Sequence, residues 1–138
     1  MKRGRLVAFA TLLTLCPTLA PGQTAAPGGP AFTAAQAERG EAAYQHWCRA
    51  CHGDSLDDGD FGGAPLKGAW FRDHWGAGNV AALFAYTKAR MPPDNPGGLN
   101  DTLFADIVAF ILLRNGYAPG ASELPVDAQA QRGMSLRK

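Results

Sequence analysis

The chain has 138 residues, 46% of them hydrophobic, and its thirteen Lys and Arg nearly balance its twelve Asp and Glu. This length fits a single domain. No basic stripe of the kind that suggests nucleic-acid binding is expected in a chain with this charge balance.

Residues 1–20 have the features of a secretory signal peptide. Three basic side chains come first, and the apolar run at 6–15 is too short to span a membrane comfortably. Cleavage would remove three of the thirteen basic residues and no acidic ones, leaving a formal charge of −2. We therefore expect a periplasmic protein whose mature domain does not insert into a membrane. Lipidation at Cys16 and an uncleaved N-terminal anchor stay open as alternatives.

Residues 21–32 are rich in Pro, Gly and Ala and are predicted to form a flexible leader. The domain is expected to begin at Thr33, which can cap a helix that has Gln36 at its third position. This helix would run to about Cys48 and bury one face, made of Ala37, Gly40, Tyr44 and either Trp47 or Cys48.

Gly40 is an unusual residue for the interior of that helix. A glycine there costs about 1 kcal/mol relative to alanine. We expect that a second backbone passes close to Gly40, and a tolerated surface glycine is the alternative.

The first helix leads into Cys48-Arg49-Ala50-Cys51-His52, a complete C-x-x-C-H motif. This motif is the attachment signature of haem c. The two thiols can form thioethers with the porphyrin vinyl groups, and the histidine can ligate the iron. A structural zinc site would need about four ligands, and His46 and His74 supply no second pair. A thioredoxin-type redox pair would follow a buried strand, whereas an alanine-rich helix precedes this motif.

The segment from 53 to 78 has many glycines and little periodicity, which predicts a loop with short turns. Asn79 can cap a second helix, from Val80 to about Ala89. Pro92 limits this helix, because the residue before a proline is pushed out of the α region.

Asn100 can cap a third helix, from Asp101 to about Asn115, and Gly116 is suited to end it. Its apolar face would consist of Leu103, Ile107, Phe110 and Ile111. Residues 118–138 are expected to be a polar, mobile C-terminal extension. No strand is predicted, so the fold class is all-α with three main helices.

The order of these motifs resembles the class I cytochromes c, which carry one haem with His/Met ligation. The resemblance covers about residues 33–117. It rests on Gly40 and Tyr44 ahead of the C-x-x-C-H motif, then Pro65-Leu66-Lys67-Gly68, Met91-Pro92-Pro93 and Ile107-Val108-Ala109-Phe110. It implies a small cytochrome c fold around one covalently bound haem, with Gly40 close to Phe110. The stretch 91–99 and the tail look most like bacterial periplasmic cytochromes and the cytochrome subunits of quinoprotein dehydrogenases.

The resemblance implies that His52 and Met91 are the two iron ligands. Apart from Met1, the only other methionine is Met134 in the tail, and the two prolines after Met91 would stiffen its loop. A core role for Met91, or ligation by His46 or His74, is the alternative.

Further haem contacts follow from the same resemblance. The second ring nitrogen of His52 would donate to the carbonyl of Pro65, which fixes the tautomer, and Leu66 would cover the haem face. Trp70, Phe71 and Trp75 would line the pocket, with plain packing as the alternative.

Iron with two axial ligands from the chain has no open position for substrate, so we expect a one-electron carrier and not an enzyme. Expected partners are redox proteins, with a periplasmic dehydrogenase as donor and a terminal oxidase or another cytochrome as acceptor. Acidic and basic side chains are balanced over residues 54–90. Electrostatic steering of a partner protein should therefore be weak or directed to a basic partner. A haem catalyst or sensor with an open sixth site is one alternative. A dedicated electron-accepting subunit of a quinoprotein dehydrogenase complex is the other.

Overall fold

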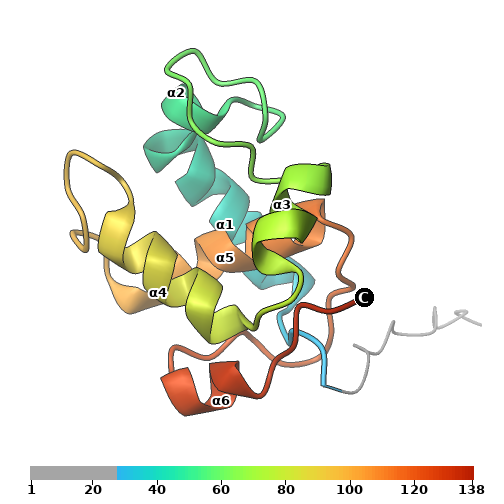
Figure 1. The fold of residues 1–138 in the computed structure, drawn as a ribbon. Coiled ribbons are helices and arrows are strands. Elements are labelled where there is room, and N and C mark those ends of the chain that lie inside the picture. The colour runs from blue at the N-terminus through green and yellow to red at the C-terminus, as the bar shows by residue number, and fades with distance from the viewer. Residues whose placement is uncertain (1–27) are drawn as a thin grey trace, which may run out of the picture.

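A computed structural model describes residues 28–138, which form a helical fold with no strand beyond an isolated backbone bridge between Asn79 and Ser135 (Figure 1). The helices are α1 (Ala34–Trp47), α2 (Arg49–His52), α3 (Gly68–Trp75), α4 (Val80–Arg90), α5 (Asp101–Arg114) and α6 (Ala128–Arg132). The all-α fold class is confirmed. The predicted signal peptide, Cys16 and most of the leader lie outside the described residues. None of the helices in 28–138 is long and apolar enough to cross a membrane.

Helices α1 and α5 cross at the centre of the fold and make its most extensive helix contact (Figure 1). Gly40 permits this crossing, because a Cβ atom there would lie 1.8 Å from the carbonyl oxygen of Asp106 and 3.0 Å from the Cβ of Phe110. The rings of Tyr44 and Phe110 pack beside it with their centroids 5.2 Å apart. The close backbone approach expected at Gly40 is therefore confirmed.

The three predicted N-caps are present. The side chains of Thr33, Asn79 and Asn100 accept the backbone N–H groups of Gln36, Ala82 and Leu103 at 3.0, 3.1 and 2.8 Å, respectively. Gly116 follows α5 with a φ of +77°, as expected for a glycine that ends a helix. These local signals suffice to begin and end α1, α4 and α5 close to their predicted positions.

One helix, α3, lies where only loop was expected, so that prediction is wrong. Its preceding residue, Lys67, makes no side-chain cap. The N–H of Gly68 is instead bound by the side chain of Asn115 at 3.1 Å, from the end of α5. On its inner side α3 buries Phe71. Because a distant side chain supplies the cap, the local sequence carries no clear signal for this helix.

The C-terminal extension packs against the rest of the chain, which corrects the expectation of a mobile tail. Leu124 and Leu136 are only 2% and 1% exposed. The carbonyl of Met134 accepts the N–H of Val80 at 3.0 Å, and α6 contacts α4. Buried apolar side chains and backbone hydrogen bonds therefore hold this largely polar segment.

Candidate haem site

An apolar cavity of about 220 Å³ brings the motif histidine and the candidate methionine to one place. Cys48, Cys51 and His52 line it from the end of α1 and from α2, and Met91 lines it from the segment after α4. Its apolar lining includes Leu66, Trp70, Trp75, Leu83, Pro92, Pro93, Ile107 and Ile111. Residues far apart in the sequence therefore share one mainly apolar cavity.

The two motif cysteines form no disulfide, and both line this cavity. The backbone N–H of Cys48 donates to the carbonyl of Tyr44 at 2.9 Å, which carries the chain from α1 into the motif. Burial raises the pKa of the Cys48 thiol to about 12, with a smaller contribution from Cys51. Before any attachment to haem, burial therefore favours the neutral thiol of Cys48.

His52 is 6% exposed, and its ring is oriented by a backbone carbonyl. Its Nδ1 lies 2.8 Å from the carbonyl oxygen of Ala64. A carbonyl oxygen can only accept, so Nδ1 donates its proton and Nε2 keeps a free lone pair. The expected acceptor was the carbonyl of Pro65, and that prediction is wrong by one residue. Pro65 is also not among the residues that line the cavity.

The position of Ala64 follows from two backbone hydrogen bonds on either side of it. The N–H of Gly63 donates to the carbonyl of Cys51 at 2.9 Å, and the N–H of Leu66 donates to the carbonyl of Leu56 at 2.7 Å. A Cβ atom on Gly63 would lie 2.8 Å from Nδ1 of His52, so only glycine allows this approach. The loop is thus held at both ends, and the carbonyl between them faces the histidine.

The structure separates the aromatic candidates of the α3 segment. Trp70 and Trp75 line the cavity, whereas Phe71 is 1% exposed within the core and does not. The alternative ligand His74 is exposed and stacks on Trp70 with ring centroids 3.7 Å apart. His46, the other alternative, also lies outside this cavity. Met91 is therefore the only one of the three candidate sixth ligands that lines the cavity.

Sequence reasoning missed two polar members of the lining, Tyr86 and Thr87 on α4. The ring of Tyr86 lies 5.2 Å from that of Trp75, and the hydroxyl of Thr87 donates to the carbonyl of Leu83 at 2.8 Å. Both follow Leu83 at the spacing of one helical turn, which was the available signal.

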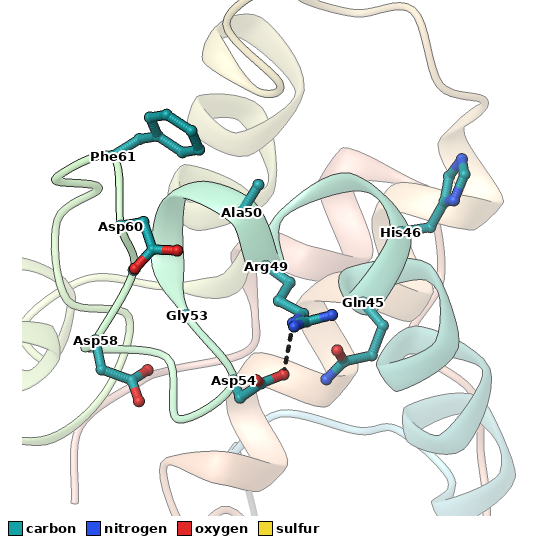
Figure 2. Close-up of a pocket in the computed structure, with 10 residues that line it drawn as sticks. Gln45, His46, Arg49, Ala50, Gly53, Asp54, Asp58, Asp60 and Phe61 are labelled. Carbon is teal, nitrogen blue, oxygen red and sulfur yellow. Dashed lines mark ion pairs between the residues drawn. The ribbon is translucent and has the colours of Figure 1, made fainter.

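A second, polar hollow of about 380 Å³ lies beside the motif (Figure 2). Arg49 pairs there with Asp54 at 2.8 Å, while Asp58, Asp60 and Phe61 occupy the neighbouring loop. No group of three or more residues suited to hold a metal ion occurs among residues 28–138. Phe61 borders both hollows and is 76% exposed, so the polar surface adjoins the mouth of the apolar cavity.

The residues present fit a haem group. Two free thiols at C-x-x-C spacing, an imidazole nitrogen with a free lone pair and apolar walls are the donor set and surroundings that haem c uses. Together with the helical fold, they define a c-type cytochrome.

Comparison with known proteins agrees with this class. Residues 35–111, more than half of the chain, match the family described as cytochrome c oxidase, cbb3-type, subunit III, and the chain belongs to this family. No curated protein and no solved structure matches the chain. The family membership confirms the small cytochrome c fold and a role in haem-based electron transfer.

Proposed function

We propose that this protein is a periplasmic one-electron carrier whose haem c is attached through Cys48 and Cys51 and ligated by His52 and Met91. The observation that carries the proposal is that all four side chains line one apolar cavity. The described lining also contains no carboxylate and no histidine besides His52. A haem catalyst that uses a carboxylate or a second imidazole for acid-base chemistry would need such a group in this lining.

Haem iron, when bound, would supply the one-electron chemistry. The chain's own residues would control the surroundings of the metal. The carbonyl of Ala64 fixes the tautomer of His52, so that Nε2 keeps a lone pair with which it would bind the iron. The apolar walls exclude water and favour the less charged ferrous state, which raises the reduction potential. With Met91 as the second protein ligand, the iron would have no position open for a substrate.

Export to the periplasm is supported by the predicted signal peptide and by the attachment chemistry of the motif. We propose a dehydrogenase as donor and an oxidase or another cytochrome as acceptor. The family description, which names a subunit of a cytochrome c oxidase, supports an oxidase.

The charge of the polar hollow indicates which kind of partner surface it would attract. The lining has three carboxylates and one guanidinium, a formal charge of −2 with His46 neutral. This favours a partner with a basic surface, and electron transfer between the two should slow as salt is added. A rate independent of salt would contradict electrostatic steering.

The ligand assignment is tested by replacing Met91. The exported holoprotein should give a low-spin ferrous spectrum and, when oxidised, the weak sulfur-to-iron band. Met91→Ala should abolish that band and allow carbon monoxide to bind the ferrous protein. The control Met134→Ala should keep the wild-type spectrum, because Met134 does not line the cavity. An unchanged spectrum in Met91→Ala would remove Met91 from the iron, and carbon monoxide binding by the wild type would favour a sensor or catalyst.

A further inference from the structure

The side chain of Asn115, at the end of α5, has all its main hydrogen-bonding groups in use. Its Nδ2 donates to the carbonyl of Leu66 at 2.8 Å and to the carbonyl of Ile111 at 2.9 Å. Its Oδ1 accepts the N–H of Gly68 at 3.1 Å. One side chain therefore joins the end of α5, the start of α3 and the loop between α2 and α3.

Two of these partners are close to His52 in the chain, because Leu66 belongs to the loop that orients His52 and Gly68 begins the helix directly after it. Leu66 is held on its other side by the bond from its N–H to Leu56, and it lies two residues after Ala64, whose carbonyl accepts from the His52 ring. Among the described residues, no backbone N–H donates to the carbonyl of Leu66. The donor to this carbonyl is the side-chain amide of Asn115. Asn115 is thus the side chain that links the His52 loop to the central helix.

We infer that Asn115 is a positioning residue for the haem iron, acting through the loop 64–68 on the hydrogen bond between His52 and Ala64. The inference rests on the proposed ligation of His52. Donation from Nδ1 to a well-placed carbonyl makes the imidazole a stronger donor to the metal, which stabilises ferric iron. Releasing the loop weakens that bond, so loss of Asn115 moves the reduction potential to more positive values.

The test compares two asparagine variants of the holoprotein. Asn115→Ala removes the links to Leu66 and Gly68, whereas Asn100→Ala removes only the N-cap of α5. Both should lower the melting temperature. Only Asn115→Ala should shift the potential to more positive values, and its ferrous His52 ring proton should exchange with solvent about tenfold faster. A potential and exchange rate equal to those of Asn100→Ala would overturn the inference.

A third variant, Asn115→Asp, distinguishes the cap on α3 from the hydrogen bond that holds the loop at Leu66. It also provides a test if Asn115→Ala does not fold. The carboxylate can still accept the N–H of Gly68, but it cannot donate to Leu66. Its charge alters the potential directly, so the exchange rate is the readout. Fast exchange of the His52 ring proton is expected, and wild-type exchange would overturn the inference.

Failure of this inference is distinguishable from failure of the proposed function. The wild-type spectrum reports whether His52 and Met91 ligate the iron before any Asn115 variant is compared. A low-spin His/Met spectrum together with an unaffected Asn115→Ala protein would reject the positioning role and leave the carrier intact.

Discussion

Two regions of this molecule, the crossing of α1 and α5 and the segment 48–68, are held in place in different ways. The crossing of α1 and α5 is a packed interior in which Gly40 lets two backbones touch and rings fill the neighbouring space. The wall formed by residues 48–68 contributes only Leu56 to the buried apolar core and is held by backbone hydrogen bonds, by Tyr44 and by Asn115. The crossing can therefore be stable through its own packing, while the wall depends on what fills the cavity beside it.

Removing the cofactor should have the largest effect, and it should destabilise the wall more than the crossing of α1 and α5. In the double variant Cys48→Ala, Cys51→Ala, no thioether can form, and the apolar cavity lining is left open to water. We expect loss of a sharp thermal transition by circular dichroism. In hydrogen exchange, amides of α5 should stay more protected than those of residues 48–68, which include α2.

The control for this variant is Ala50→Ser, which changes a residue between the thiols and keeps both. It should retain haem and a sharp transition. Equal protection of α2 and α5 in the cofactor-free protein would contradict the division into two regions.

Gly40→Ala should have the next largest effect, because it inserts a methyl group into the crossing. The new Cβ would lie 1.8 Å from the Asp106 carbonyl oxygen, so the two helices must move apart. We expect the free energy of unfolding to fall by about 3 kcal/mol in guanidinium titrations of the holoprotein.

The matched control is Gly133→Ala, where the added Cβ would lie 3.5 Å from the nearest atom, the Ala130 carbonyl oxygen, in ordinary contact. It should leave the stability within about 0.5 kcal/mol of the wild type. If both alanines had the same small effect, the crossing would not be as tight as the geometry requires.

Tyr44→Phe should have the smallest effect, and it tests the link between the two regions. The Tyr44 hydroxyl donates to the carbonyl of Gly53, directly after His52, at 2.7 Å. Losing this bond should cost about 1 kcal/mol of unfolding free energy. The variant should still bind haem, since Phe keeps the packing of the ring.

The same variant should change how stability depends on pH. Burial raises the pKa of Tyr44 well above its usual value. The folded pKa thus exceeds the unfolded one, so this contribution is fully present below about pH 10 and is lost as the pH rises through the folded pKa. Tyr44→Phe should lack that part of the alkaline loss, whereas the control Tyr86→Phe, at an exposed position, should retain it. An identical alkaline curve in Tyr44→Phe would contradict the assignment.

Much of the site could be predicted because its signals are local or chemically specific. The C-x-x-C-H spacing predicts haem attachment from five consecutive residues, and the N-cap side chains of Thr33, Asn79 and Asn100 mark three helix starts. Gly40 was informative for a different reason, since a glycine inside a helix is costly unless a neighbour requires it.

The errors have one physical origin, which is contact between residues distant in sequence. Helix α3 takes its cap from Asn115, and the C-terminal extension is ordered by the surfaces that bury Leu124 and Leu136. The His52 acceptor is Ala64 because bonds on both sides of it determine which carbonyl faces the ring. None of these partners lies within a helical turn of the residue that it orders.

The amino-acid sequence by itself determined the haem chemistry, the all-α class and the positions of α1, α4 and α5, because motif spacing and capping act over a few residues. Only the tertiary structure decided that Met91 shares a cavity with His52, that Ala64 orients the histidine and that Asn115 holds that loop. These depend on where the ends of distant segments meet once the helices pack, and short-range patterns do not encode those distances.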